Sequence, residues 1–438
     1  MLKRKMTKEL EKWKKMTRKP CLVIKGARQV GKTYIVREFA KANYDNFIEI
    51  NFELEKSRRS IFDGDLDIKT LKMGLELNYP DVKLVPGKTL LFLDEIQTCP
   101  NARVALKTFA MDGTIDVIAS GSLLGLHNKE VSSLPVGYVK TLEMLPLDFE
   151  EFLWGMGISE DTIETLRGAF VDKRKLSSGM IDKMEEYFRL YMIVGGMPEV
   201  NEIFLEHHSI QEAREKQIDL LADYEDDIAK YATTVDKPKI RKTFHSIPVQ
   251  LAKTNKKFMF SEIDAEKSSG EGERKYASAL LWLQDAGIVN FCYNLSEPTA
   301  PLVTRQLANI YKVYLRDTGL LMAMLEAGAQ KEIWEKNYDV NAGSIVENVV
   351  AEEIYTRYKD VMYFEKRGKL EMDFMVNIDG EVTAVEIKSG KHTQSKSMSS
   401  IVDNYKTVKR YMKLEVGAQP MVDEKGVELY PLFMSMFI

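Results

Sequence analysis

The segment GARQVGKT at residues 26–33 restricts the fold of this chain more than any other stretch of its sequence. It has the spacing G-x-x-x-x-G-K-[ST], it follows the apolar run CLVIK, and it precedes the helix-forming run TYIVREFAKA. Gly26 and Gly31 allow the backbone to curl so that several N–H groups face one point, which the positive end of the following helix also faces. The order of strand, loop and helix therefore predicts a parallel α/β sheet with a phosphate-binding loop at its edge.

This loop supplies most of the residues that we expect to bind a nucleotide. Lys32 is suited to neutralise the β- and γ-phosphates of ATP, and Thr33 is suited to offer its hydroxyl to Mg²⁺. The expected nucleotide-binding residues are Gly26, Ala27, Arg28, Gln29, Val30, Gly31, Lys32, Thr33 and Tyr34. The alternative is a glycine-rich turn that matches the spacing by chance, and the agreement of strand, loop and helix counts against it.

An acidic pair follows a second apolar strand. Residues 89–93 in TLLFLDEIQ are apolar-rich, and Asp94 and Glu95 stand at the carboxyl end of this run, where ligands bind in open α/β sheets. We expect Asp94 to hold Mg²⁺ and Glu95 to orient and deprotonate an attacking water. In TIDVIASGSLLG, the hydroxyl of Ser120 or Ser122 could touch the γ-phosphate or its water. The alternatives are a solvated strand end and serines that serve a turn.

The first third of the chain alternates short apolar runs with helical stretches. An amphipathic helix is expected over residues 2–16, and the strand candidates are 21–25, 47–52, 89–94, 115–120 and 139–145. This alternation is typical of a parallel sheet covered by helices. Residues 151–235 have a mostly helical pattern.

The composition excludes several classes of protein. The formal net charge is −4, so a global basic field for nucleic acid is absent and any such binding must come from local patches. The three cysteines lack paired spacing, which argues against disulfides and a zinc site. No stretch approaches the roughly 20 apolar residues that span a bilayer. We therefore expect a cytoplasmic protein that does not bind membranes.

The middle of the chain contains a local basic patch. Residues 237–258, KPKIRKTFHSIPVQLAKTNKKF, are rich in lysine and arginine. The helix expected in ERKYASALLWLQDAGIV has Arg274 and Lys275 in its first turn, where positive charge opposes the helix dipole. One interpretation is a winged-helix segment that contacts the DNA backbone. The other is a helix that packs one domain against another and leaves a solvated basic face.

A possible second site lies in EMDFMVNIDGEVTAVEIKSGK, residues 371–391. Asp379-Gly380 is a strong signal for a two-residue hairpin turn. Alternation along the two strands would bring Asp373, Glu386 and Lys388 to one face. Asp373 and Glu386 could hold Mg²⁺, which polarises a phosphodiester, and Lys388 could position a water or stabilise negative charge.

Glu347, in the first turn of a helix expected over residues 343–358, would complete this second site. Each residue also has a simpler interpretation. Ser344 and Glu347 have the spacing of a capping box. Glu386 and Lys388 could form a surface ion pair worth less than about 1 kcal/mol. A nuclease fold can also persist as an inactive binding platform.

Eight ordered motifs, taken together, resemble a known family. They are VIKGARQVGKT, LLFLDEIQ, VIASGSLLG, MLPLDFEEFL, GGMPEV, YLRDTGLL, and GSIVENVVAEEI with EIKSGK. The chain resembles the AAA-type ATPases of bacteria and archaea that carry a C-terminal PD-(D/E)xK nuclease-like domain. The resemblance implies the strand order 5-1-4-3-2, and it implies that Pro198 lies near the adenine, as in STAND-type ATPases. Many relatives have Gly-Arg where this chain has Gly137-Tyr138; Arg28 and Arg103 are candidate substitutes.

The predicted fold class is α/β, a P-loop AAA+ parallel-sheet core with added domains. The expected domains are an ATPase core at 1–155, a helical lid at 156–235, a winged-helix-like segment at 236–300 and a PD-(D/E)xK nuclease-like domain at 301–438. The expected function is ATP hydrolysis coupled to action on duplex or branched DNA. A homo-oligomer is a possible assembly. The alternative is a STAND-like, ATP-gated switch whose nuclease-like tail is an inactive module that binds protein or DNA.

Overall fold

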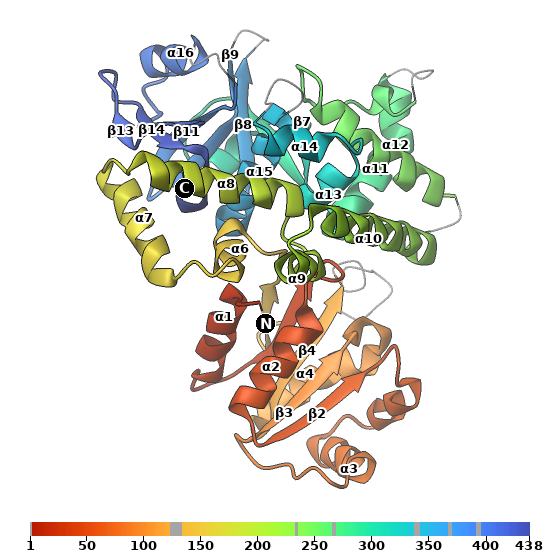
Figure 1. The fold of residues 1–438 in the computed structure, drawn as a ribbon. Coiled ribbons are helices and arrows are strands. Elements are labelled where there is room, and N and C mark those ends of the chain that lie inside the picture. The colour runs from red at the N-terminus through yellow and green to blue at the C-terminus, as the bar shows by residue number, and fades with distance from the viewer. Residues whose placement is uncertain are drawn as a thin grey trace. The chain divides into compact units, whose positions relative to one another are not determined.

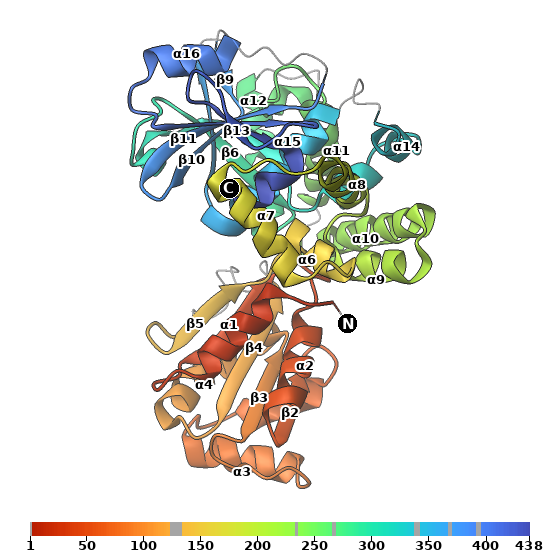
Figure 2. The same ribbon diagram turned by 60° about the vertical axis from the view of Figure 1, so that its left-hand side comes forward.

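A computed structural model describes residues 2–122, 134–232, 235–264, 269–336, 342–366, 370–390 and 396–438 (Figure 1, Figure 2). The chain forms two compact units. The first is mainly residues 3–145, and the second is mainly residues 146–438. Residues 123–125, the end of the motif VIASGSLLG, lie outside the described residues.

The first unit is built on a five-stranded parallel sheet. Its strands are β1 (Cys21–Gly26), β2 (Asn46–Asn51), β3 (Thr89–Asp94), β4 (Asp116–Ser122) and β5 (Val139–Glu143). Their spatial order is β2-β3-β4-β1-β5, which is the predicted order 5-1-4-3-2 read from the other edge. The strand predictions are therefore confirmed within one or two residues at each end, the usual precision of such boundaries.

Helices cover both faces of this sheet, which explains why its central strands are apolar throughout. The helices are α1 (Lys5–Lys14), α2 (Lys32–Asn43), α3 (Ile68–Asn78) and α4 (Pro100–Asp112), with short 3-10 turns η1 (Lys56–Phe62) and η2 (Ile96–Thr98). Successive side chains of β1 alternate between the faces. Leu22 packs with α1 and α2, whereas Val23 packs with α3 and α4.

The second unit begins with a series of helices, as the sequence predicts. They are α6 (Phe149–Gly155), α7 (Glu160–Asp172), α8 (Ser178–Val194), α9 (Pro198–His207) and α10 (Ile210–Tyr231). Local signals start and stop them. Asp148 and Glu151 form a capping box at the start of α6, and Gly195 ends α8 with φ 72°.

The basic middle of the chain folds into two further helices and a strand pair. These are α11 (Lys237–Leu251), η3 (Phe260–Glu262), α12 (Ser269–Asp285), β6 (Val289–Leu295), η4 (Leu302–Arg305) and β7 (Gln306–Leu315). Because α12 begins at Ser269, Arg274 and Lys275 lie in its second turn, and the expectation of a first-turn pair was wrong. Lys275 forms an ion pair with Asp264 at 2.8 Å, so a protein carboxylate accounts for one of the two charges.

The remainder of the chain contains four helices and seven strands among its described residues. The helices are α13 (Thr318–Ala323), α14 (Ala329–Trp334), α15 (Ala342–Tyr358) and α16 (Lys396–Asn404), and a 3-10 segment, η5 (Leu432–Phe437), follows the last strand. The strands are β8 (Val361–Lys366), β9 (Leu370–Met372), β10 (Phe374–Ile378), β11 (Glu381–Lys388), β12 (Arg410–Glu415), β13 (Met421–Val422) and β14 (Glu428–Pro431).

Two sheets organise this region, with orders β10-β11-β12-β14-β13 and β7-β6-β8-β9. The predicted hairpin is confirmed, since β10 and β11 pair around Asp379 and Gly380, which have φ 51° and 88°. The strand expected over 371–377 is instead two strands, interrupted at Asp373. β6 pairs with β7 and with β8, so one sheet includes residues on both sides of the expected boundary at 300/301. The domain limits inside the second unit stay a prediction.

The expectations about disulfides and about membrane-spanning segments can be compared with the structure. Cys21, Cys99 and Cys292 are all buried free thiols, so they form no disulfide. Throughout the described ranges, none of the helices has both the length and the apolar character needed to cross a membrane.

Candidate functional site

The predicted phosphate loop connects the carboxyl end of β1 to the first turn of α2. Gly31 has φ 92°, a left-handed conformation that glycine adopts without strain, and Gln29 has φ 62°. A Cβ atom at Gly26 would overlap the carbonyl oxygen of Met144. Glycine is therefore required at position 26 because the backbone after β5 forms the rear wall of the loop.

Lys32 lies inside this loop. Its side chain is buried, and its Nζ donates hydrogen bonds to the carbonyl oxygens of Gly26 at 3.1 Å and Ala27 at 2.7 Å. Burial lowers the pKa of Lys32 to about 8, although the charges of Glu95 and Asp94 oppose that shift. A buried ammonium group with only carbonyl partners is poorly compensated, so an anion in the loop would stabilise its charged form.

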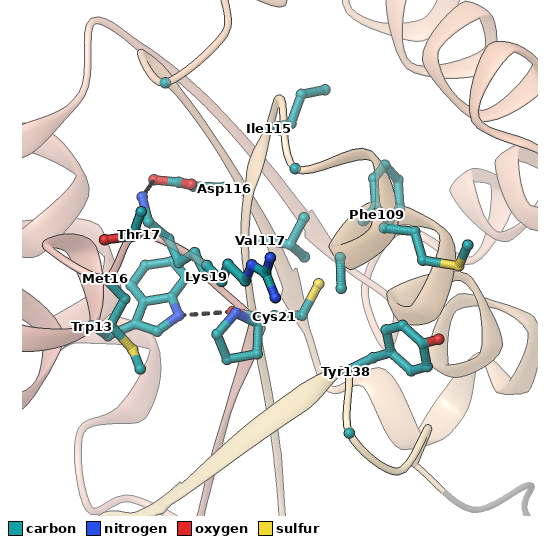
Figure 3. A pocket seen from close by; sticks show the side chains of 17 residues that line it. Trp13, Met16, Thr17, Lys19, Cys21, Phe109, Ile115, Asp116, Val117 and Tyr138 are labelled. Atoms are coloured by element: carbon teal, nitrogen blue, oxygen red, sulfur yellow. Dashed lines mark hydrogen bonds and ion pairs between the residues drawn. The ribbon is translucent and has the colours of Figure 1, made fainter.

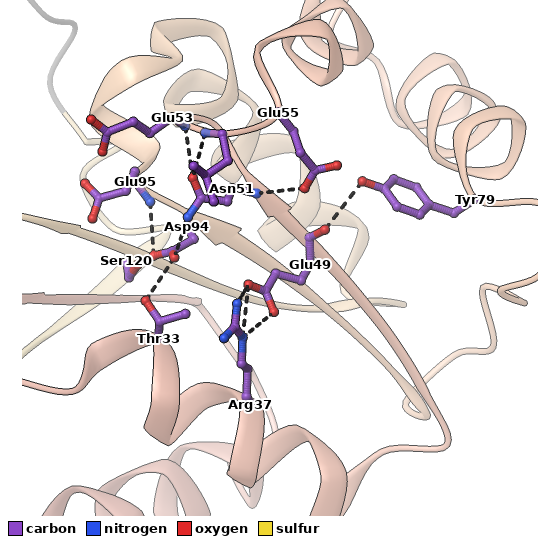
Figure 4. Close-up of polar contacts among 11 residues, drawn as sticks. Thr33, Arg37, Glu49, Asn51, Glu53, Glu55, Tyr79, Asp94, Glu95 and Ser120 are labelled. Atoms are coloured by element: carbon purple, nitrogen blue, oxygen red, sulfur yellow. Dashed lines mark hydrogen bonds and ion pairs between the residues drawn. The ribbon is translucent and has the colours of Figure 1, made fainter.

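Asp94 is the centre of a polar cluster at the carboxyl edge of the sheet (Figure 4). Its Oδ2 accepts hydrogen bonds from Thr33 Oγ1 at 2.9 Å and from Asn51 Nδ2 at 3.0 Å, and its Oδ1 accepts from the hydroxyl of Ser120. The Asp94 side chain is buried. Thr33 and Asp94 thus bring two hard oxygen ligands together beside Lys32, which fits a magnesium ion carried by a nucleotide.

Glu95 lies next to this cluster. Its backbone is left-handed with φ 53°, its N–H donates to Asp94 Oδ1 at 3.2 Å, and its carboxylate accepts a hydrogen bond from the Gln97 amide. Ser122, the last residue of β4, is in register with Gly26. The loop, the acidic pair and Ser122 therefore all lie at the carboxyl ends of β1, β3 and β4.

The two candidate arginines and the outlying nucleotide-binding candidates lie in different environments. Arg28 is half-buried in the loop, and its charge helps to lower the pKa of Lys32, so it is close to the phosphate site. Arg103 is buried inside α4, which does not suit a residue that reaches out to another subunit. Tyr34 is 45% exposed in the first turn of α2, while Pro198 is the first residue of α9 in the second unit. The predicted contact of Pro198 with adenine stays a prediction.

A cavity of about 720 Å³ opens at the opposite ends of the strands from the phosphate loop (Figure 3). Cys21 and Asp116, which begin β1 and β4, line it together with Trp13, Lys19 and Tyr138. Lys19 and Asp116 form an ion pair at 2.6 Å within it. Because the loop leaves the carboxyl end of β1, this cavity is distinct from the nucleotide site.

Three residues of the second predicted site lie on or directly beside the hairpin of β10 and β11. Asp373 lies between β9 and β10, and its Oδ2 accepts a hydrogen bond from the backbone N–H of Ile387 at 2.8 Å, which joins it to β11. On β11, Glu386 Oε1 pairs with Lys388 Nζ at 3.0 Å. Glu386 is only 3% exposed, and its Oε2 has no hydrogen-bond partner among the described residues. A buried carboxylate oxygen without a described partner is suited to a bound cation.

Glu347 has a different environment from Asp373 and Glu386. Its Oε2 accepts a hydrogen bond from Tyr314 Oη at 3.0 Å, and its Oε1 pairs with Lys256. Lys312 Nζ lies 3.8 Å from Glu347 and 2.7 Å from Glu371. Both oxygens of Glu347 are therefore engaged by protein groups, and this residue is a poor candidate to bind the cation directly.

The electrostatics of this carboxylate cluster reflect its burial. Burial and the charge of Glu347 raise the pKa of Asp373 to about 7, while Lys312 and the N–H of Ile387 act in the opposite direction. Burial alone would lower the pKa of Lys312, but the surrounding carboxylates raise it above its usual range. Across the described part of the chain, no group of three or more acidic, histidine or cysteine residues has the arrangement of a metal site. The cluster therefore offers a cation two carboxylates at most.

Sequence reasoning missed the lysines in this cluster. Lys256 and Lys312 are far from the EIK motif in the sequence, and their spacing carries no signal of its own. Lys312 lies between Tyr311 and Val313 in β7, and its side chain is only 1% exposed. The sequence does not show which face of this strand is buried, so it does not reveal that Lys312 is inside. Sequence reasoning also missed Asn51. A polar residue at the carboxyl end of a strand next to that of Asp94 could have indicated its place in the site.

The motifs GGMPEV and YLRDTGLL meet in a packed junction within the second unit. The N–H of Gly196 donates to Asp317 Oδ2 at 2.6 Å, and the N–H of Leu320 donates to Asp317 Oδ1 at 2.8 Å. A Cβ atom at Gly196 would overlap the carbonyl of Leu147, and one at Gly319 would overlap the carbonyl of Val194. Close packing therefore explains these glycines without a ligand.

Helix α15 joins this junction to the carboxylate cluster. Asn348 Nδ2 donates to Thr318 Oγ1 at 2.8 Å and to Glu352 Oε1 at 2.8 Å, and the Thr318 hydroxyl also bonds to Glu352. Glu347, one residue before Asn348, reaches Tyr314 and Lys256 instead. One helix thus contributes to both arrangements.

Comparison with known families identifies the first unit. Residues 18–153 match the model AAA_14, described as an AAA domain. This match and the parallel sheet with its phosphate-type loop give the first unit the fold of an AAA domain. Residues 185–331 and 342–432 match two models described as domains of unknown function, DUF8612 and DUF4143.

The individual proteins that resemble this chain share little sequence identity with it. A protein of Methanocaldococcus jannaschii with no characterised function is 26% identical over 373 residues, which cover 81% of this chain and 71% of that protein. Among solved structures, a Walker-type ATPase of Pyrococcus abyssi has a TM-score of 0.44 at 13% identity, covering 74% of this chain and 96% of its own. The Orc1 protein of Aeropyrum pernix in complex with DNA has a TM-score of 0.28 at 12% identity, covering 76% and 90%.

Proposed function

We propose that this chain binds ATP with Mg²⁺ at the loop of residues 26–34 and hydrolyses it. The observation that carries the proposal is the hydrogen bond between Thr33 and Asp94 at 2.9 Å, next to the buried ammonium group of Lys32. When bound between Thr33 and Asp94, Mg²⁺ would neutralise charge on the phosphates. These side chains come from two separate segments, the start of α2 and the end of β3, and a shared nucleotide ligand accounts for their meeting.

The residues of the site have distinct tasks in this proposal. Lys32 exchanges its hydrogen bonds with the Gly26 and Ala27 carbonyls for bonds to phosphate oxygens. Asp94 orients the Thr33 hydroxyl, while Asn51 and Ser120 hold Asp94 in place. Glu95, one residue further on, accepts the proton of the attacking water.

Two measurements test this proposal on the purified full chain. Titration of a fluorescent ATP analogue should give saturable binding that Lys32→Ala abolishes. Phosphate release from ATP should require Mg²⁺ and should stop when EDTA is added. A parental protein that binds no nucleotide, or that binds it as tightly after Lys32→Ala, would overturn the assignment.

We further propose that duplex DNA is a partner of the second unit, through the exposed face of α11. Arg241, Lys242 and His245 are exposed on one side of this helix. Glu225 lies near two of them, 3.7 Å from Arg241 and 2.9 Å from His245, which limits the positive potential. Lys242 is then the strongest single candidate for a phosphate contact, and the winged-helix assignment of this segment belongs to the same proposal.

The tail has two candidate roles, and each has an observation in its favour. The orphaned Oε2 of Glu386 beside Asp373 favours a cation-dependent nuclease, in which Lys388 would stabilise developing negative charge. The pairing of Glu347 with Lys256 and Lys312 favours a STAND-like switch with an inactive tail. Cleavage of duplex and branched DNA in the presence of Mn²⁺ distinguishes them.

A further inference from the structure

Arg4 is a buried arginine that contacts the phosphate loop from behind. Its Nη1 donates a hydrogen bond to the carbonyl oxygen of Val30 at 3.1 Å, and its Nη2 donates to the carbonyl oxygen of Leu145 at 2.6 Å. The residue is 9% exposed and lies directly before α1. No feature of the phosphate-loop motif predicts it, because it stands 26 positions before Val30.

The contact with Val30 controls one peptide group of the loop. The carbonyl of Val30 and the N–H of Gly31 belong to the same planar peptide, so they point in opposite directions. A guanidinium group that holds this carbonyl therefore also fixes the direction of the Gly31 N–H. Lys32, the next residue, bonds to the carbonyls of Gly26 and Ala27 within the loop, where phosphate oxygens are expected.

The contact with Leu145 ties the same guanidinium group to the rear wall of the loop. Met144, the neighbouring residue, donates its N–H to the carbonyl of Lys25 at 2.7 Å, and its own carbonyl leaves no room for a side chain at Gly26. Arg4 thus joins the Val30 end of the loop to the segment that packs behind Gly26. Charge-assisted hydrogen bonds to two carbonyls are stronger than neutral ones.

Helix α1 delivers this guanidinium group from a fixed position. Leu10 and Trp13 are fully buried in the same apolar cluster as Val36 of α2. Trp13 also donates its indole N–H to the carbonyl of Pro20 at 2.8 Å. The amphipathic helix that the sequence predicts is therefore an integral part of the nucleotide-binding unit.

We propose that Arg4 is a positioning residue for nucleotide binding, which orients the Val30–Gly31 peptide toward the phosphates. The inference rests on the proposed binding of ATP at this loop. It assigns a role to the segment before β1, and it does not require Arg4 to touch the nucleotide.

The test compares ATP affinity, turnover and stability in four proteins, each the full chain. They are the parent, Arg4→Ala, Arg4→Lys and the control Lys15→Ala, which changes an exposed charge at the other end of α1. Arg4→Ala should raise the Kd of a fluorescent ATP analogue by about tenfold or more. KM should rise in parallel while kcat changes little, because the loop binds phosphates in ground state and transition state alike. Arg4→Lys should lie between, since lysine is a single charge without the planar fork, and Lys15→Ala should match the parent.

The outcomes separate this inference from the function on which it rests. A parent that binds no ATP analogue overturns both. A parent that binds, together with Arg4→Ala that binds equally well, overturns only the role of Arg4, whatever the change in melting temperature. If Arg4→Ala does not fold, the Kd of Arg4→Lys is compared with that of the parent instead. A raised Kd at a near-parental melting temperature supports the inference, and a parental Kd overturns it.

Discussion

The hydroxyl of Thr33 and the carboxylate of Asp94 are 2.9 Å apart, although 61 positions separate them in the sequence. Thr33 belongs to the helix that follows β1, and Asp94 ends β3. Strand β4 lies between those two strands, and its Ser120 bonds to the other oxygen of Asp94. The strand order of the sheet therefore assembles the site.

Removal of the proposed general base should separate binding from chemistry. Glu95→Gln keeps the size and the contact with Gln97 but cannot accept a proton. We expect ATP binding within about twofold of the parent and turnover at least about 100-fold slower. Phosphate release and analogue titration measure the two effects. Glu76→Gln, an exposed change on α3, is the matched control, and parental turnover in Glu95→Gln would contradict the assigned role.

The nucleotide-free protein should tolerate the loss of the Lys32 charge. Burial lowers the pKa of Lys32 to about 8, below its value of 10.5 in an unfolded chain. Between these two pH values the unfolded state holds the extra proton, so the free energy of unfolding of the parent should rise with pH. Below pH 8 the penalty is complete, at most roughly 3 kcal/mol.

Lys32→Met removes this penalty and keeps the aliphatic stem. Denaturant unfolding at pH 7 should find it at least as stable as the parent, and its stability should show a smaller rise between pH 8 and 10. If Lys32→Met is clearly less stable at pH 7, the hydrogen bonds to Gly26 and Ala27 outweigh the cost of burial.

Glu352 should make the protein less stable as the pH rises. Burial, with the charge of Asp317, raises the pKa of Glu352 well above 4.5. Above pH 4.5 the native state holds a proton that the unfolded state has lost, so stability should fall by about 1.4 kcal/mol per pH unit up to the folded pKa. Glu352→Gln resembles the neutral acid and should flatten this slope. Melting temperatures measured from pH 5 to 8 give the slope for each protein, and the exposed change Glu424→Gln is the control. If Glu352→Gln leaves the slope unchanged, Glu352 is ionised in the native state.

Binding of DNA should depend on the exposed face of α11. Arg241→Ala with Lys242→Ala should weaken duplex binding and reduce the slope of log Kd against log salt concentration by up to about two units, since each lost phosphate contact removes roughly 0.9. Lys331→Ala with Lys336→Ala, on and beside α14, removes equal charge elsewhere and should have no such effect. Fluorescence anisotropy at four salt concentrations measures the slope. Equal slopes for both double variants would show that this face of α11 does not contact DNA.

The carboxylate cluster should bind one divalent cation if the tail is a nuclease. Mn²⁺ should then raise the melting temperature of the parent, and Glu386→Gln should lose this shift because it removes the charge at the orphaned oxygen. Cleavage of DNA should disappear in Asp373→Ala, Glu386→Ala and Lys388→Ala while ATP turnover remains. A parent without any Mn²⁺ shift and without cleavage, tested with ATP present, supports the switch with an inactive tail instead.

The sequence predicted the first unit well because local signals determine it. Residues 21–33 combine a buried strand, a glycine-dependent loop and a helix start, and the structure has each of them in place. The hairpin around Asp379 and Gly380 was predictable for the same reason, since two positive φ angles favour that residue pair.

The contacts that sequence reasoning missed all connect distant segments. Arg4 reaches Leu145 across 141 positions, and Lys256 reaches Glu347 across 91. A lone arginine or lysine has no periodicity, and its partner is decided by how whole elements pack. The basic pair Arg274 and Lys275 was misjudged because the start of α12 lies a turn earlier than its charge pattern suggested.

The crowded junction of Gly196, Asp317 and Gly319 has a consequence for how the second unit opens. Gly319 at the start of α13 packs directly on the carbonyl of Val194 at the end of α8, and Asp317 bonds to the N–H groups of Gly196 and Leu320. A shift of α8 or α13 alone would therefore break the bonds to Asp317. Asn348 and Glu352 add α15 to the same arrangement. We therefore expect these three helices to open as one foldon, exchanging their amide hydrogens in a single cooperative event and not helix by helix.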